Sequence, residues 1–158
     1  MLIQGKILSY GSDLSEVIDI RRKVFIQELN MEENEEFDDQ DSYAIHVVVY
    51  EQGDRINPVA TGRLIFDGTT CEIGHVAVLK EYRNKKYGDF AVRMLINKAF
   101  TSGIHEVTIK TPNNLIEFYH RIGFKIKKEA AEAEDTKECI MSVHDGDVVT
   151  CCHKNNYI

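Results

Sequence analysis

Hydrophobic positions follow two different spacings along this chain, and each spacing predicts one kind of element. Apolar residues that alternate with polar ones, or that form short unbroken runs, predict strands. The predicted strands cover residues 2–9, 43–51, 59–67, 70–79, 104–110, 124–128 and 139–144, with 148–152 as an extension or a further strand. Apolar residues three or four positions apart predict helices. The predicted helices cover residues 13–30, 88–103 and 111–123.

Capping residues set the ends of the predicted helices. Asp13 with Glu16 three positions later forms a capping-box pattern that begins the first helix. Thr111 caps a short helix with Pro112 at its first position, where the missing N–H costs nothing, and Gly123 ends it. The order strand, helix, strand over residues 70–110 requires a parallel pairing in the sheet. At 158 residues, a single domain over 1–158 is expected.

Composition and charge narrow the functional classes. The chain is 43% hydrophobic with two prolines, as in an ordinary globular protein. Its formal net charge of −7 argues against nucleic-acid binding, which uses a basic face. No basic and apolar leader opens the sequence, and no apolar run is long enough to span a bilayer. We therefore expect a cytoplasmic protein without membrane contact.

Four cysteines raise the question of a disulfide or a metal site. Cys71, Cys139, Cys151 and Cys152 lack the spacing of a disulfide framework, and a cytosolic setting keeps thiols reduced. Cys151 and Cys152 are adjacent and precede His153, but structural zinc pairs usually have about two to four residues between their cysteines. Buried packing is the favoured role, and no metal site is predicted.

An acidic run covers residues 32–41, where seven of ten residues are carboxylates. Such a run repels itself, which favours a solvated loop. The alternative is functional. The carboxylates would then flank the binding site of a substrate that accepts a transferred group, and they would attract cationic amines, with Phe37 as an apolar anchor.

A basic turn follows the predicted strand 70–79 and precedes the helix 88–103. It contains Arg83, Lys85 and Lys86 against the acidic background of the chain. A strand end with free backbone N–H groups, followed by a helix N-terminus, suits a pyrophosphate. The turn therefore predicts a nucleotide-like cofactor.

The order and spacing of three motifs resemble those of the GNAT acetyltransferase superfamily over most of the chain. Residues 83–88 match its Q/R-x-x-G-x-G/A turn, except that Lys86 stands at the first glycine position. Residues 118–124, with the sequence FYHRIGF, are similar to its second motif. Residues 24–28 and the acidic residues 36–41 look like the first helix and loop of a bacterial subgroup. The resemblance implies an α+β GNAT-like fold with a mixed sheet of about six or seven strands and about four helices.

The resemblance also implies that acetyl-coenzyme A binds in a V-shaped gap between strands 70–79 and 104–110. There the N–H of Val78 would stabilise the thioester oxyanion. The implied cofactor contacts lie at the strand end, the turn, the helix start and a later asparagine: Val76, Ala77, Val78, Arg83, Asn84, Lys85, Lys86, Tyr87, Gly88, Asp89 and Asn114. Lysine at the first glycine position is expected to modify cofactor binding. It lacks the freedom of glycine to adopt positive φ, but its ammonium can contact a phosphate directly.

Two catalytic groups are expected. Tyr119 matches the family's tyrosine that protonates the coenzyme A sulfur. Glu72 is the leading candidate for the base, because strand alternation places Glu72, Gly74, Val76 and Val78 on one face. An exposed strand carboxylate is an equal alternative for Glu72. His75 is the competing base, which regular alternation points away from Glu72 unless a bulge at Gly74 reverses it.

The predicted function is transfer of an acetyl group from acetyl-coenzyme A to a primary amine, on a small molecule or a peptide, by direct attack in a ternary complex. Alternation sets Cys71 opposite Glu72, which argues against a covalent cysteine route. The alternative is a non-catalytic acyl-coenzyme A binding module with a regulatory role, and a structural assembly protein is a weaker one. Exposed sheet edges in such a fold invite dimers, so a homodimer is an open expectation.

Overall fold

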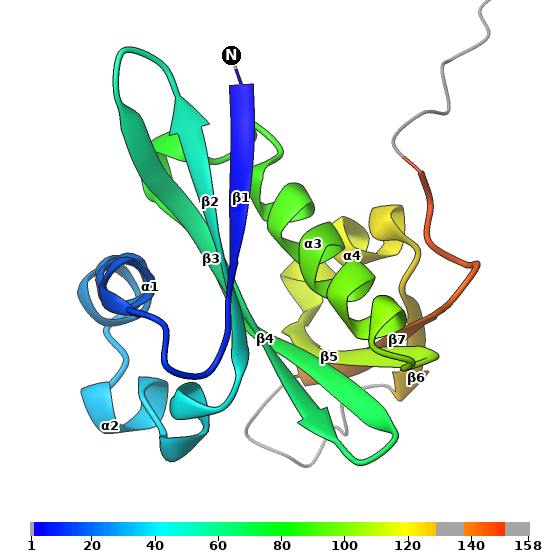
Figure 1. The fold of residues 1–158 in the computed structure, drawn as a ribbon. Helices are drawn as coiled ribbons and strands as arrows, with labels where there is room; N and C mark the ends of the chain where they lie inside the picture. The colour runs from blue at the N-terminus through cyan, green and yellow to red at the C-terminus, as the bar shows by residue number, and fades with distance from the viewer. Residues whose placement is uncertain (1, 129–137, 151–158) are drawn as a thin grey trace, which may run out of the picture.

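A seven-stranded mixed sheet forms the centre of the protein (Figure 1). The computed structural model describes residues 2–128 and 138–150. The strands are β1 (Leu2–Leu8), β2 (Ile45–Gln52), β3 (Ile56–Asp67), β4 (Thr70–Val78), β5 (Glu106–Pro112), β6 (Lys125–Lys128) and β7 (Glu138–His144). Their spatial order is β1-β2-β3-β4-β5-β7-β6. β4 and β5 run parallel, and the other described pairs are antiparallel. The predicted α+β fold with a mixed sheet is confirmed.

Helices cover both faces of the sheet (Figure 1). One face, here called the α1 face, carries α1 (Ser15–Arg21), the π-helix Arg22–Glu28 that continues it, and α2 (Glu33–Glu36). The other, the α3 face, carries α3 (Tyr87–Thr101) and α4 (Ile116–Ile122). Short 3-10 helices lie at Asp39–Ser42, Lys80–Tyr82 and Asn113–Leu115. None of the helices in the described parts of the chain is long and apolar enough to cross a membrane.

The core has two apolar clusters, one on each face of the sheet. Val47 belongs to the cluster that packs against Leu95 of α3, and the next residue, Val48, belongs to the cluster that packs against Ile20 of α1. Period-two alternation therefore places side chains of one strand in two different cores. The close approach of α3 to β3 depends on glycine at position 62, because a Cβ there would lie 2.9 Å from the Leu95 side chain.

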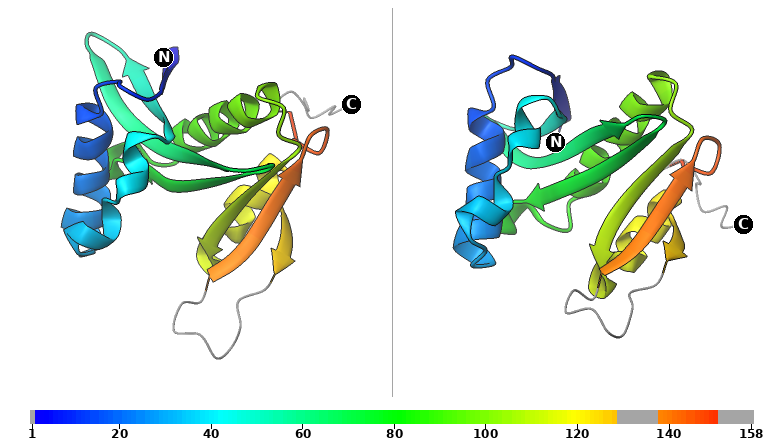
Figure 2. Two further views of the ribbon diagram at one scale, coloured as in Figure 1. Left: turned by 60° about the horizontal axis from the view of Figure 1, so that its bottom comes forward. Right: turned by 90° about the horizontal axis from the view of Figure 1, so that it is seen from below.

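The sheet opens between its two central strands. β4 and β5 pair only at Cys71, Glu72 and Ile73 of β4, although β4 continues to Val78 and β5 to Pro112. Beyond Ile73 the two strands diverge, as the views from below show (Figure 2). Main-chain groups on the facing edges of a V-shaped gap are thus left without their sheet partner.

Some predicted boundaries are wrong. Thr111 does not cap a helix: it pairs with Cys139 within the sheet, so β5 runs through Pro112 and the helical turn begins afterwards. The pairing with β7 satisfies the backbone that a helix would otherwise use. The first helix begins at Ser15, whose N–H donates to the Asp13 carboxylate at 2.9 Å. Residues 148–150 are irregular rather than a strand, and 151–152 lie outside the described residues.

Candidate functional site

The edge of β4 presents backbone N–H groups to the gap. The N–H of Leu79 donates to the carbonyl of Val59 in β3 at 2.9 Å. Successive N–H groups of a strand point to opposite sides. The N–H groups of Val78 and Val76 therefore point away from β3, toward the gap that β5 leaves open. Each N–H aimed at this unfilled edge can donate to a carbonyl oxygen, and such a donor stabilises negative charge that develops on that oxygen.

A β-bulge interrupts β4 at His75. Thr61 of β3 pairs with Ala77, but Arg63 pairs with Gly74, so β4 carries an extra residue between these two pairs. The strained backbone conformation lies at His75, which has a positive φ of 49°. Bulges of this kind redirect side chains and concentrate near functional sites.

The bulge corrects the predicted face of Glu72. Cys71 and Ile73 belong to the core of the α3 face, which places Glu72 between them on the α1 face. Val76 and Val78 pack against the α3-face core as well, so they do not share a face with Glu72. The extra residue shifts the alternation by one. The shift brings His75, predicted to point the opposite way under regular alternation, onto the face of Glu72.

The basic turn forms a tight cradle at the start of α3. Asn84 and Lys86 both adopt left-handed backbone conformations, with φ of 64° and 68°. Lys86 is the residue that precedes the first turn of α3. Gly88 lies against the end of β4, since a Cβ there would lie 3.2 Å from Val78 Cγ2 and 3.5 Å from Phe118 Cζ. The backbone of this turn is thus curved, close-packed and followed by a helix N-terminus, which suits an anion.

Arg83 and Lys85 of the turn pair with acidic side chains. Arg83 donates from Nε to the Val78 carbonyl at 3.1 Å and from both terminal nitrogens to Glu28 at 2.6 Å each. The hydrogen bonds from Arg83 hold the pKa of the Glu28 carboxyl below its ordinary value. Lys85 lies 3.8 Å from the carboxylate of Glu51. Asp89 pairs with Arg93 at 2.7 Å, one turn along α3.

Tyr87 differs from the other residues of the turn, because its side chain is core. It is 1% exposed, and its hydroxyl donates to Glu51. Burial, together with this carboxylate, raises the pKa of Tyr87 to about 12. Ala77, also predicted to contact a cofactor, is 2% exposed and packs in the α1-face core. Only the backbone of these two residues can face the gap.

The left-handed conformation at Lys86 gives a first prediction. A side chain in this conformation costs about 1–2 kcal/mol, and glycine relieves that cost while adding roughly 0.4–1 kcal/mol of chain entropy to the unfolded state. Lys86→Gly is therefore expected to raise the free energy of unfolding by about 0.5–1 kcal/mol in urea titrations. The control is Lys85→Gly, since Lys85 is not among the residues with positive φ. It should lower that free energy, and an equal effect of both changes would contradict the prediction.

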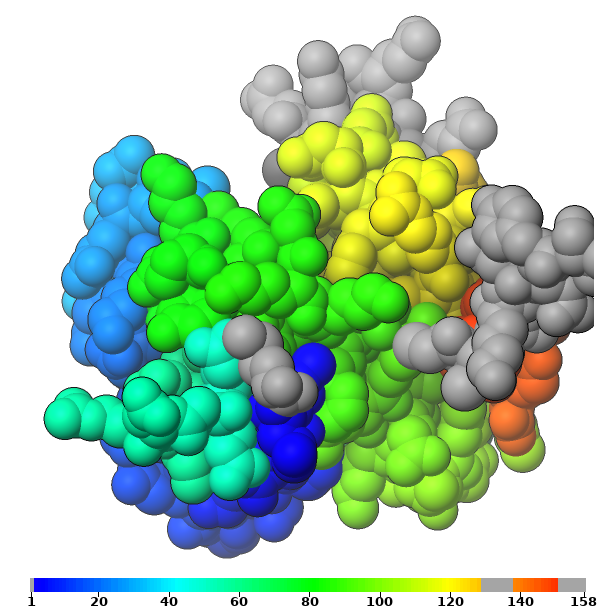
Figure 3. Space-filling view, turned by 90° about the horizontal axis from the view of Figure 1, so that it is seen from above, coloured from blue at the N-terminus to red at the C-terminus, as the bar shows by residue number. Residues whose placement is uncertain are grey.

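Tyr119 and Asn114 lie beyond the turn, on the other side of the gap. Tyr119 is 4% exposed and packs edge-to-face against Phe118 and Phe124, with ring centroids 4.8 and 5.7 Å away. Burial raises the pKa of its hydroxyl far above the ordinary value, so the group stays protonated. Asn114 is exposed in the 3-10 turn after β5. The start of α3 and the α4 region lie side by side on one face of the molecule (Figure 3), in agreement with the Gly88–Phe118 approach.

Glu72 lies on the surface of β4. Its side chain is 47% exposed, and Lys110 of β5 lies 3.5 Å from its carboxylate. Cys71 next to it is buried, which raises the pKa of the thiol to about 11. A thiol with such a pKa is a poor nucleophile at neutral pH.

A buried network of charges joins α1 to the acidic run. Arg21 is 1% exposed and donates from Nε to Glu36 at 2.6 Å and from Nη1 to Asp41 at 2.7 Å. Arg63 of β3 donates to Asp38 at 2.6 Å and to Asp41 at 2.8 Å. Burial acts to raise the pKa of Asp41, but hydrogen bonds from the two arginines lower it by more. The pKa therefore lies below its ordinary value.

The prediction of a solvated run holds for most of its carboxylates, which are exposed, but it is wrong for Glu36 and Asp41. Glu36 is 1% exposed, and residues 33–36 and 39–42 are helical. Arg21 and Arg63 pair with three carboxylates of the run, Glu36, Asp38 and Asp41, which a local charge count cannot show. The missed signal was the position of Arg21, four residues after Val17 and three before Val24, on the apolar stripe of the helix rather than on another face.

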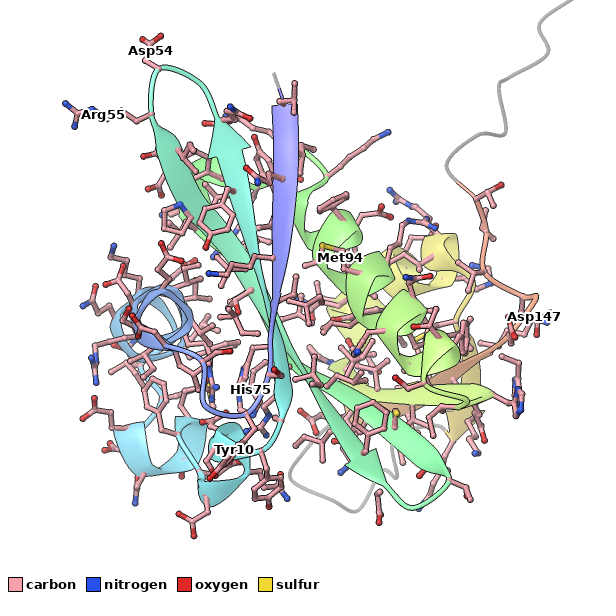
Figure 4. All side chains as sticks on the ribbon, viewed as in Figure 1. Tyr10, Asp54, Arg55, His75, Met94 and Asp147 are labelled. Carbon is pink, nitrogen blue, oxygen red and sulfur yellow. The ribbon has the colours of Figure 1, made fainter. Side chains whose placement is uncertain are left out.

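His75 reaches into this network from the bulge (Figure 4). Its Nδ1 lies 2.9 Å from each carboxylate oxygen of Glu36 and 3.3 Å from Arg21 Nη2. The ring of Phe25 meets it edge-on, with centroids 6.0 Å apart. His75 is 20% exposed, so the ring is held at one nitrogen and still accessible. An ordered imidazole beside a gap can accept or donate a proton.

Residues 2–128 and 138–150 contain no group of three His, Cys, Asp or Glu side chains that could hold a metal ion. The adjacent cysteines 151 and 152 and His153 lie outside the described residues.

A sequence profile described as "Acetyltransferase (GNAT) family" matches residues 14–124, well over half of the chain. The protein YyaT of Bacillus subtilis is 30% identical over 127 residues, which cover 78% of this chain and 84% of that one.

Solved structures share the fold at lower identity. ElaA of Escherichia coli is 22% identical with a TM-score of 0.73, over 89% of this chain and 99% of ElaA. A PaiA N-acetyltransferase of Thermoplasma acidophilum, solved in complex with coenzyme A, is 19% identical with a TM-score of 0.66, over 91% and 99% of the two chains. At these identities the structural likeness shows the fold.

Proposed function

Because the chain belongs to the acetyltransferase (GNAT) family, we propose that it transfers an acetyl group from acetyl-coenzyme A to a primary amine. The observation that carries the proposal is the split between β4 and β5. It leaves the Val76 and Val78 N–H groups facing an open edge, directly before the cradle that starts α3. A donor for a thioester carbonyl and a site for a pyrophosphate thus lie in sequence along one strand and turn.

The cradle fits a pyrophosphate by its backbone. Left-handed conformations at Asn84 and Lys86 curve the chain so that consecutive N–H groups converge, as in other anion-binding nests. Gly88 lets the first turn of α3 approach Val78. Arg83, Lys85 and Lys86 add positive charge around this turn. We propose that Asn114, exposed after β5, contacts the cofactor from the opposite side of the gap.

Direct transfer in a ternary complex needs a base for the amine and an acid for the leaving thiolate. We propose Tyr119 as the acid, since its hydroxyl stays protonated. The base is Glu72 or His75, which the bulge places on the same face of β4. The acceptor amine then approaches from the α1 face. No covalent enzyme intermediate is required, in keeping with the buried thiol of Cys71.

The second candidate function is a non-catalytic module that binds acyl-coenzyme A. Lysine at the first glycine position of the turn favours it, because Lys86 holds a left-handed conformation that glycine adopts at lower cost. A module of this kind would bind the cofactor without turnover.

Calorimetric titration with acetyl-coenzyme A and with free coenzyme A tests the proposal first. We expect micromolar binding, roughly −8 kcal/mol. A panel of primary amines should then give acceptor-dependent release of thiol from acetyl-coenzyme A. Binding without release for any amine would favour the non-catalytic module, and no binding of either ligand would refute both functions.

A further inference from the structure

His75 stands where the sheet begins to open. The last residue of β4 that pairs with β5 is Ile73, and the N–H of Val76 faces the gap. His75 lies between these two residues, at the apex of the gap. We infer that His75 is the base that deprotonates the acceptor amine and that Glu36 is its positioning residue. The inference rests on the acetyl transfer proposed above and names a residue for one step of it.

The contacts of His75 fix which ring nitrogen carries the proton. Nδ1 lies 2.9 Å from both oxygens of the Glu36 carboxylate, and these two short contacts to acceptors outweigh the longer one, 3.3 Å, to the Arg21 Nη2 donor. Nδ1 therefore bears the hydrogen, and Nε2 of the neutral ring has the lone pair. Within the described part of the chain, Nε2 makes no hydrogen bond to another residue. The free nitrogen of the ring is the one that can take a proton.

Glu36 is itself held in place. Its side chain is 1% exposed, and Arg21 donates to its Oε1 at 2.6 Å. Arg21 also donates to the backbone carbonyl of Glu36. The carboxylate therefore cannot turn away from the imidazole without breaking a buried ion pair. Such an arrangement, in which an acid fixes the tautomer and orientation of a histidine, is the usual support of a histidine base.

Other charges around His75 belong to the same network. The groups that face the ring are Arg21 of α1, Glu36 of α2 and the apolar ring of Phe25. One contact further away lie Asp41, bonded to Arg21, and Arg63, bonded to Asp41. Each cation has at least one carboxylate partner, so the network can accept a proton on His75 without leaving an unpaired buried charge.

Backbone strain also singles out His75. A non-glycine residue with φ of 49° within a strand is uncommon, and a glycine stands directly before it at Gly74. Strained backbone conformations cluster at functional sites. Glu72, the competing base, has no comparable support: it is 47% exposed, and its described partner is the exposed Lys110.

The proposed step balances as follows. An acceptor ammonium gives one proton to His75 Nε2 and becomes a neutral amine, whose lone pair forms the N–C bond to the thioester carbon. The C–S bond breaks, and the thiolate takes its proton from Tyr119. The amide nitrogen loses its remaining extra proton to the phenolate, which restores Tyr119, and His75 releases its own proton to water.

His75→Gly provides the test, because glycine accepts the positive φ and keeps the bulge. We expect kcat to fall by about 10²- to 10³-fold with an unchanged Kd for acetyl-coenzyme A. Free imidazole should raise the kcat of this variant at least about tenfold, which a purely structural role of His75 would not allow. The decline of kcat toward low pH should flatten, since the protonated histidine is the inactive form. His105→Gln, which changes an exposed histidine, is the matched control.

Glu36→Gln tests the positioning role. It should lower kcat less than His75→Gly while the KM for the amine and the Kd for acetyl-coenzyme A stay unchanged, because the imidazole is still present but is no longer held by a carboxylate. Glu72→Gln runs in parallel. A wild-type rate in His75→Gly, or a larger loss in Glu72→Gln than in His75→Gly, would overturn the inference alone. No thiol release by the wild-type protein with any amine would instead overturn the proposed function and the inference with it.

Discussion

Tyr119→Phe is expected to reduce turnover by about 10²-fold while the Kd for acetyl-coenzyme A stays within about twofold. The hydroxyl is the only atom removed, and the ring keeps its edge-to-face contacts with Phe118 and Phe124. Burial raises the pKa of this hydroxyl, so it carries its proton at neutral pH. A loss of 10²-fold corresponds to about 2.7 kcal/mol of transition-state stabilisation.

Stopped-flow or steady-state thiol release with one active amine measures this effect. Tyr50→Phe is the control, since it removes a tyrosine hydroxyl that donates to Glu16 on the α1 face, away from the gap. Both variants should unfold at similar urea concentrations. If Tyr119→Phe turns over like the wild type, Tyr119 is not the acid, and its role is packing alone.

Arg21→Met is expected to lower the free energy of unfolding by about 3–5 kcal/mol. Arg21 bonds Glu36 and Asp41 from a position that is 1% exposed. Methionine fills similar volume but leaves the buried Glu36 carboxylate without its strongest partner, and an uncompensated buried charge is costly. Urea denaturation monitored by circular dichroism gives the difference directly.

The neighbouring residue provides the control. Arg22 pairs with Glu33, but the two side chains are 46% and 59% exposed. Ion pairs this accessible contribute about 1 kcal/mol or less, so Arg22→Met should change stability by no more than that. Equal losses in the two variants would show that the network is no more important than a surface pair.

The order of elements followed from the sequence because it depends on local pattern. Period-two and period-3.6 spacing located the seven strands and α3, and Gly123 ended α4 with a φ of 122°. Residue types and the place between a strand and a helix predict an anion site at the basic turn Arg83–Gly88, and the turn does lie at the start of α3. Such features need only a few neighbouring residues to be read.

The candidate base was harder to identify, because it depends on one extra residue. Regular alternation predicted that Glu72 shares a face with Val78, but the bulge at His75 shifts the second half of β4 by one position. Whether a strand accommodates a bulge is decided by its partner, since Arg63 and Thr61 of β3 set the register on either side. No local pattern in β4 contains that information.

The sequence by itself determined the family, the mixed sheet and the position of the cradle, since each is set by short-range spacing of residue types. Only the tertiary structure decided that Arg21 of α1, Glu36 of α2 and His75 of β4 meet in one buried network. These residues are up to 54 positions apart, and their attraction depends on burial that many distant segments create together. Two carboxylates of a run that looks solvated in isolation, Glu36 and Asp41, are thereby drawn into the buried network, while the rest of the run stays exposed.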